Sequence, residues 1–258
     1  MGWMEKIAAV AMVSLAGAAV ASAQSFQISQ NGKSVGTANL QLSKAAAGFT
    51  ATSTAKIDMP GLKYSFNENQ SLDASYHLTN AQLKGLVNGS AASVNTTRAA
   101  QQFVMKINAN SNAINTPLTF HPLAVFFPDF DPAALQVLLN LGAAHNNSDI
   151  WALVPKQSGS ITALRIATDA DMKGTLDGNA VAVHHFTVTY DANKTEVFSG
   201  PANDLLQVEW TSEGFAMVRQ GFKLTPPAHP GAPPPQQPAQ PQGQTQPQGQ
   251  APPQPQPQ

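Results

Sequence analysis

The sequence contains no cysteine at any of its 258 positions. This absence excludes disulfide bonds, thiolate metal ligands and a cysteine nucleophile. It also excludes a lipoprotein-type export signal, which needs a cysteine to lipidate after its cleavage site. An exported domain of this composition must therefore be held together by a full-sized hydrophobic core.

Charged side chains are also scarce. Lys and Arg number 14 and Asp and Glu number 15, so that charged residues make up 11% of the chain, against about a quarter of an ordinary soluble domain. The net charge of −1 gives no field strong enough to collect phosphates. We therefore expect a polar but mostly neutral surface and no nucleic-acid partner.

The first 23 residues have the features of a signal peptide. Lys6 supplies a positive start, residues 7–20 are apolar, and positions 21–23 (Ala-Ser-Ala) match a cleavage site, so the mature chain is expected to begin at Gln24. The apolar run is shorter than the roughly 20 residues of a membrane-spanning helix, and no later segment is longer. We expect an exported protein that does not span the membrane after cleavage.

The opposite end, residues 226–258, consists almost entirely of Pro, Gln, Gly and Ala. A segment with so little to bury is expected to be disordered, with polyproline II character. It can serve as a spacer or a weak wall-binding arm, or it can be an unselected tail. Residues 24–225 remain, and their number suits one β-rich domain.

Apolar residues recur at every second position through much of residues 24–225. The pattern begins at Leu62, Phe103, Leu164, Phe186 and Leu206, and it is typical of strands with one buried face.

Asn-Gly and Asp-Gly pairs at positions 31–32, 88–89 and 177–178 predict tight hairpin turns between such strands. A parallel α/β fold is not expected, because the helix that it needs after each strand is missing. We predict a mainly β fold, a curved antiparallel meander that forms a half-open β-barrel.

A helical insert near residues 121–144 breaks this period. Residues 121–127 are expected to form a short apolar turn or helix. Asp131 followed by Pro132 predicts the N-cap and first position of a second helix that ends near Gly142.

This second helix is apolar nearly all round, since only Gln136 and Asn140 interrupt residues 133–141. A helix without a polar face must be enclosed by other elements, so we expect it to plug the half-open barrel, with Gln136 facing whatever opening remains. The helix either completes the core or helps to line a cavity for an apolar ligand. The ligand-binding residues predicted on the second alternative are Phe126, Phe127, Phe130, Leu135, Leu138 and Leu139.

Three stretches carry a resemblance to known proteins. They are residues 34–38 (Ser-Val-Gly-Thr-Ala), 149–155 (Asp-Ile-Trp-Ala-Leu-Val-Pro) and 214–219 (Gly-Phe-Ala-Met-Val-Arg). The expected layout is an exported antiparallel meander interrupted by one apolar helical segment. With this layout and these stretches, the chain resembles the bacterial periplasmic half-barrel proteins typified by the lipoprotein carriers LolA and LolB, and related uncharacterised envelope families. The resemblance implies a periplasmic or secreted protein of the bacterial envelope, with a barrel that holds an acyl chain. No functional residue matches position by position, so none is carried over.

Residues 169–180 resemble a calcium-binding loop but lack two of the ligands that such a loop needs. Asp169, Asp171, Gly174 and Asp177 have the spacing of its first nine positions, but Lys173 occupies a ligand position and the closing glutamate is absent. We expect a hairpin turn there.

The histidines do not form a motif. His184 and His185 are neighbours on an expected strand, so they point to opposite faces and cannot bind one ion together. His77, His121 and His145 can meet only through folding.

No nucleophile-elbow, zinc-protease, Walker or dinucleotide motif occurs. Asp131 is assigned to helix capping and Asp129 to a turn. We therefore predict no catalytic residue, no metal ligand and no cofactor.

Three classes of function follow. The leading hypothesis is a non-enzymatic envelope protein that binds or carries an apolar, lipid-like molecule or scaffolds other envelope proteins. The alternative is a secreted hydrolase with a site assembled from dispersed His and carboxylates. A small outer-membrane barrel is disfavoured, because most strands are too short and too polar outside for a lipid-facing band of about 25 Å.

Overall fold

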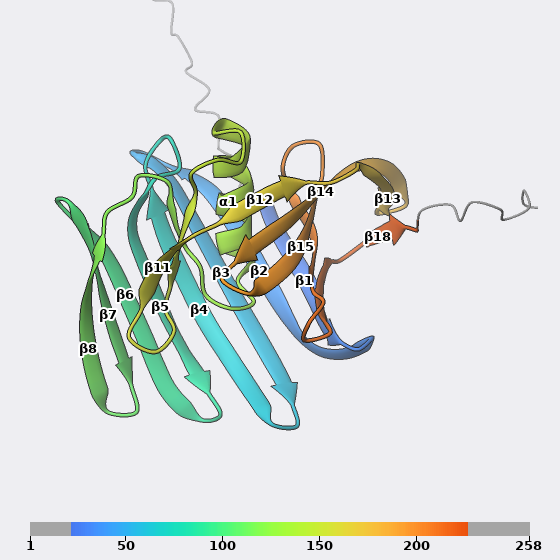
Figure 1. The fold of residues 1–258 in the computed structure, drawn as a ribbon. Helices are drawn as coiled ribbons and strands as arrows, with labels where there is room; N and C mark the ends of the chain where they lie inside the picture. The colour runs from blue at the N-terminus through green and yellow to red at the C-terminus, as the bar shows by residue number, and fades with distance from the viewer. Residues whose placement is uncertain (1–21, 227–258) are drawn as a thin grey trace, which may run out of the picture. The chain divides into compact units, whose positions relative to one another are not determined.

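The computed structural model describes residues 22–226, most of which lie in one large antiparallel sheet (Figure 1). In its first half each strand pairs with the next along the chain. These strands are β1 (Ser22–Gln30), β2 (Lys33–Ala45), β3 (Gly48–Met59), β4 (Leu62–Leu72), β5 (Leu78–Val87), β6 (Ser90–Ala99), β7 (Gln102–Ala109) and β8 (Asn112–Thr119). The predicted signal peptide, apart from positions 22 and 23, and the Pro/Gln-rich tail after position 226 lie outside the described residues and stay predictions.

The second half of the sheet is built from the later strands. They are β12 (Arg165–Thr168), β13 (Met172–Leu176), β14 (Asn179–Tyr190), β15 (Asn193–Ser199), β16 (Leu205–Trp210), β17 (Phe215–Arg219) and β18 (Phe222–Thr225). Strands β1 and β17 pair antiparallel and so join the two halves. The order runs from β18 to β8, and the sheet does not close into a barrel. The predicted antiparallel meander is confirmed.

A small sheet and one helix, α1 (Pro132–Ala144), lie against one face of the large sheet, which we call its inner face (Figure 1). We call the opposite face the outer face. The small sheet contains β9 (Ala124–Phe126), β10 (Trp151–Val154) and β11 (Ser160–Ala163). Strands β9 and β10 pair in parallel, which the crossover through α1 makes possible.

The expectation of a turn or helix over residues 121–127 holds only for the turn at residues 122 and 123, and it is wrong for residues 124–126, which form β9. The strand is fully buried, and its flanks are tied to β10: the Trp151 amide donates to the Leu123 carbonyl at 3.0 Å and the Phe127 amide to the Leu153 carbonyl at 2.9 Å. Parallel pairing thus satisfies buried backbone groups that a single helical turn would leave open.

Helix α1 begins as predicted. Asp131 has an extended backbone, and its side chain accepts a hydrogen bond from the Ala133 amide at 2.9 Å. The helix runs past Gly142 to Ala144, because the amide of the C-cap residue His145 still donates to helical carbonyls. Within residues 22–226, no helix has the length and hydropathy that a membrane crossing needs.

The predicted plug is present: α1 packs on β2, β3 and β16, strands from both halves of the sheet. Gln136, however, does not face an opening. It is 5% exposed, its Oε1 accepts from the Leu205 amide at 3.0 Å, and its Nε2 donates to the Asn203 carbonyl at 2.8 Å. The expectation is wrong because the loop before β16 covers this side of the helix and needs partners for its backbone.

The main core follows the predicted period of two, with one exception. Val208 of β16 lies in the core between the sheet and α1. Leu206 belongs to a second cluster with Val183, Phe198 and Phe222. A register irregularity beside Ser199 explains this, since an extra residue in a strand reverses the side-chain alternation.

The three predicted hairpin turns are confirmed by their backbone angles. Asn31, Asn88 and Asp177 have φ of 48°, 49° and 50°, and the glycine after each also has positive φ, as two-residue turns of this kind require. The turn at Asp177 joins β13 to β14, so the segment resembling a calcium loop forms a hairpin.

Replacing Gln136 with Leu should lower the free energy of unfolding by about 1–3 kcal/mol, because the Leu205 amide and the Asn203 carbonyl lose their partner in a buried place. Denaturant unfolding measures this difference. Gln82→Leu, at an exposed position of β5, is the matched control. Equal stability of the two variants would contradict the buried hydrogen bonds of Gln136.

Candidate functional site

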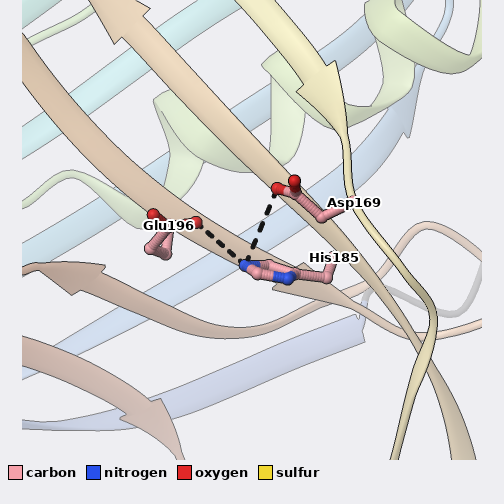
Figure 2. Close-up of side chains that lie close together, drawn as sticks. All are labelled: Asp169, His185 and Glu196. Carbon is pink, nitrogen blue, oxygen red and sulfur yellow. Dashed lines mark hydrogen bonds and ion pairs between the residues drawn. The ribbon is translucent and has the colours of Figure 1, made fainter.

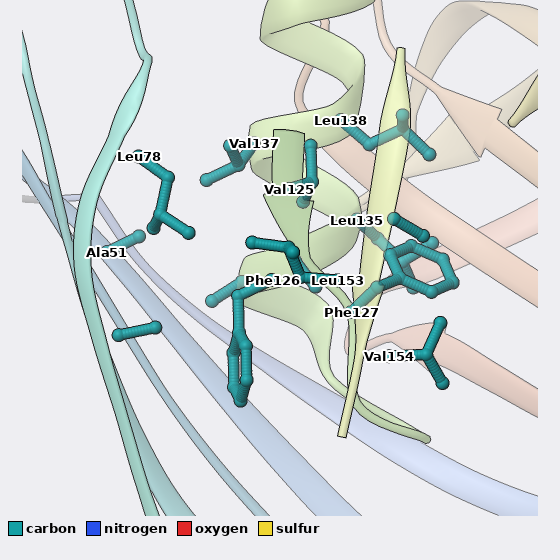
Figure 3. Packing of buried hydrophobic residues seen from close by; sticks show 14 of the residues in the cluster. Ala51, Leu78, Val125, Phe126, Phe127, Leu135, Val137, Leu138, Leu153 and Val154 are labelled. Carbon is teal, nitrogen blue, oxygen red and sulfur yellow. The ribbon is translucent and has the colours of Figure 1, made fainter. Parts of the chain in front are cut away.

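The structure places all of the predicted ligand residues except Phe130 within the hydrophobic core. Phe126, Phe127, Leu135, Leu138 and Leu139 are each no more than 8% exposed. Figure 3 shows the first four among the buried side chains around the helix and the small sheet. The protein's own side chains therefore fill the space around α1, as in the alternative in which the helix completes the core.

Phe130 lines an apolar hollow of about 450 Å³ on the inner face of β4 to β7. The floor of this hollow, which we call the inner groove, includes Leu83 of β5, Val94 of β6 and Ile107 of β7. Residues 128–130 and 155–157 form its other wall. The groove exists because α1 packs mainly on β2, β3 and β16, so that this end of the inner face has no helix above it.

Polar groups stand at the wall of the inner groove. Lys156 Nζ lies 2.9 Å from Asp129 Oδ1, and the Tyr64 hydroxyl donates to the Asp129 carbonyl at 3.4 Å. Burial, reinforced by the charges of Asp129 and Asp131, raises the pKa of Tyr64. Burial opposes the charge of Lys156, but the hydrogen bond and charge of Asp129 outweigh it and raise the pKa of that ammonium. Near neutral pH, Tyr64 is therefore a neutral donor and Lys156 is charged.

A smaller hollow of about 180 Å³ adjoins the inner groove. We call it the polar hollow. It shares Asp129, Phe130 and Lys156 with the groove, so that the two spaces meet at these side chains. Its other walls include Tyr190, Asn193, Lys194, Trp210, Glu213 and Phe215.

Two carboxyl groups are buried together under the N-terminus of α1. Glu68 is 3% and Asp131 is 1% exposed. The Ser53 hydroxyl lies between them, 3.3 Å from Glu68 Oε2 and 2.5 Å from Asp131 Oδ1. The strand register places Ser53 directly opposite Glu68, and helix capping brings Asp131 to the same point. Glu68 Oε1 and Asp131 Oδ2 have no hydrogen-bond partner among residues 22–226.

Burial changes the protonation of this pair. It raises the pKa of Asp131 to about 6, although hydrogen bonds from Ser53 and from helix amides lower it. Burial, and then the charge of Asp131, raise the pKa of Glu68 well above its ordinary value. Neither carboxyl lines the inner groove, so we interpret the pair as structural, with burial favouring the protonated form of Glu68.

The dispersed histidines of the hydrolase alternative do not meet in the groove. His77 pairs with Asp73 at 3.0 Å and His121 with Asp149 at 3.3 Å. Within residues 22–226, these two and His145 form no group with metal-binding geometry, and no histidine lines the inner groove.

One group of His and carboxylate side chains does converge. Asp169, His185 and Glu196 meet on the opposite face of the sheet. In the sequence, Asp169 belongs to the calcium-loop spacing and His185 to the pair of neighbouring histidines, whereas Glu196 belongs to neither pattern. The register of the strands brings the three residues together, since Thr187 of β14 stands opposite Glu196 of β15. The sequence does not show which strands pair or in which register.

Glu68→Gln should make the folded protein more stable at pH 8, because an amide cannot ionise. A carboxyl whose pKa is raised on folding stabilises the fold at low pH and loses that contribution as the pH rises from its unfolded value to its folded one. The advantage of the variant should therefore be smallest near pH 4 and should increase as the pH rises toward 8.

Denaturant unfolding at a series of pH values checks this. Glu213→Gln, at an exposed site, is the control and should leave the pH profile unchanged. A Glu68→Gln profile parallel to that of the wild type would show that Glu68 is not strained by burial.

We compared the chain with protein-family models, with curated protein sequences and with solved structures, and none of the three comparisons found a match.

Proposed function

We propose that the protein is a non-enzymatic binding protein of the bacterial envelope that takes up a lipid-like molecule, with its apolar chain in the inner groove. The groove itself carries the proposal. Its volume of about 450 Å³ lies within the range of about 300–1,000 Å³ that is typical of small-molecule sites. Its floor is formed by apolar side chains from adjacent strands.

Unburied apolar surface at this end of the sheet supports the proposal. Val87, which lines the groove, is 41% exposed. Around α1, by contrast, the core is closed by the protein's own side chains. Contiguous apolar surface left open beside a filled core is typical of a binding site.

The polar hollow offers a place for a polar head group. It meets the groove at Phe130 and Lys156, so a molecule with its chain in the groove can place its head there. Cations and anions are balanced around the hollow, with Lys156 and Lys194 set against Asp129 and Glu213. This balance suits a neutral or zwitterionic head.

The location of the proposed activity rests on sequence features. The predicted signal peptide supports export, and the resemblance to half-barrel carriers supports an acyl chain as the ligand. The hydrolase alternative gains no support from the groove, which has carboxyl and lysine side chains at its wall but no histidine.

Filling the groove should abolish binding. Ala92 of β6 lines the groove and stands opposite Ala109 of β7, so Ala92→Phe places a ring in the space proposed for the chain. Affinity for a fluorescent fatty acid should fall at least tenfold, about 1.4 kcal/mol. Calorimetry of the wild type should give a negative heat-capacity change, as apolar burial does.

The matched control is Ala91→Phe, which adds the same ring on the opposite face of β6 and should bind like the wild type. If the folded wild type binds no apolar probe, or if Ala92→Phe binds as tightly, the ligand proposal is wrong and a scaffold role is favoured.

The polar hollow contains an intrinsic reporter, Trp210. In a background with both Trp3→Phe and Trp151→Phe, which leaves Trp210 as the one tryptophan of the sequence, a non-fluorescent amphiphile should change the emission of Trp210 by altering the polarity around the indole. An alkane of equal chain length should displace the fluorescent fatty acid and leave that emission unchanged. An equal response to both molecules would place the head group elsewhere.

A further inference from the structure

Strands β12, β14 and β15 bring three potential metal ligands together on the outer face of the sheet, away from the inner groove. Asp169 follows β12, His185 lies on β14 and Glu196 on β15 (Figure 2). The Asp169 amide donates to the His185 carbonyl at 2.9 Å, and Thr187, two residues after His185, stands opposite Glu196. Alternation along β14 then puts all these side chains on one face.

The ligand atoms are close enough to share one ion. His185 Nε2 lies 2.9 Å from Glu196 Oε2 and 4.0 Å from Asp169 Oδ2, and all three ligand atoms lie within 4.8 Å of one another. Zinc bonds of about 2.0–2.1 Å in a tetrahedral site separate neighbouring ligand atoms by about 3.4 Å. The observed distances bracket this value, so small side-chain rotations complete the geometry.

Two contacts hold the ligands in place. The His185 ring stacks on Phe198, with centroids 4.4 Å apart and planes 5° apart, so its Nε2 points toward the two carboxylates. The Thr187 hydroxyl lies 2.7 Å from Asp169 Oδ2 and 3.0 Å from Glu196 Oε2. A hydroxyl carries one proton and can donate to one carboxylate at a time, so the cluster has more acceptors than Thr187 can satisfy.

We propose that Asp169, His185 and Glu196 form a binding site for Zn²⁺ or a similar divalent transition-metal ion. One imidazole nitrogen and two carboxylate oxygens are ligands that zinc accepts, and three protein ligands leave the fourth position to water. The side chain of Asp169 is 39% exposed, so an ion can enter from solvent. The three ligands line neither the inner groove nor the polar hollow, although Lys194, which contacts Glu196, also lines the polar hollow.

Lys194 is the natural competitor of the ion. Its Nζ lies 2.7 Å from Glu196 Oε1, the oxygen that does not contact His185. Glu196 Oε2 stays available to a metal, but the nearby ammonium reduces the attraction of the site for a second cation. Removing the charge of Lys194 should therefore strengthen metal binding.

A neighbouring pair supplies the matched comparison. His184 and Asp171 make a similar contact of 3.0 Å, one residue along the strand and on its opposite face. That pair has one carboxylate where the proposed site has two, and two ligands hold a zinc ion far more weakly than three.

Titration calorimetry of the tag-free, chelator-treated protein with ZnCl₂ tests the proposal. We expect one ion per chain and a rise in melting temperature with added zinc. His185→Gln and Asp169→Asn should each weaken binding more than about tenfold, His184→Gln should have no effect, and Lys194→Gln should bind at least as tightly as the wild type. Co²⁺ should give the visible absorption of a site with a nitrogen ligand.

The absence of zinc binding by the folded wild type would overturn the proposal, as would undiminished binding by both His185→Gln and Asp169→Asn. A loss of binding in His184→Gln as large as in His185→Gln would also overturn it, since the ion would then lie elsewhere. Circular dichroism in the presence of chelator verifies that each variant is folded. Asp169→Asn, at the more exposed ligand, serves if His185→Gln does not fold.

Discussion

Helix α1 has no polar face to turn toward water, so other elements must enclose it on every side. The sheet meets this constraint from two directions, with β2 and β3 from its first half and β16 from its second. The helix has 13 residues and is about 20 Å long, whereas the 12 residues of β3 span about 40 Å. The helix therefore cannot cover the whole inner face, and the inner groove is the part that it leaves open.

Enclosing the helix also brings polar groups into the interior. Asp131 caps the helix by accepting a hydrogen bond from the Ala133 amide, and Gln136 accepts one from the Leu205 amide at the start of β16. Both side chains are buried because the backbone groups that they bind are buried. The pair formed by Asp131 and Glu68 is harder to explain by stability alone, because two buried carboxyls cost free energy unless one stays protonated. We infer that it helps to position the helix on the sheet, since the Ser53 hydroxyl of β3 contacts both the Asp131 cap of the helix and Glu68 of β4.

The sequence predicted the features that depend on local chemistry. Alternating apolar residues, the Asn-Gly and Asp-Gly turns and the Asp131 cap each act over a few residues and were found where expected. The missed features depend on pairings between distant segments. Strand β9 exists because β10 pairs with it, and Leu206 changes face because of an irregularity opposite Ser199. The candidate sites also depend on such pairings. Of the predicted ligand residues only Phe130 lines the groove, and no sequence pattern includes Glu196.

The pairing of β1 with β17 has a consequence for how the chain reaches this structure. The Gln30 side chain donates to the carbonyl of Glu213, 183 positions later in the chain, and the register continues from there along both strands. The halves of the sheet can thus join only when nearly the whole domain has been synthesised. Such non-local contacts slow folding, so the complete sheet can form only after β17 has been synthesised.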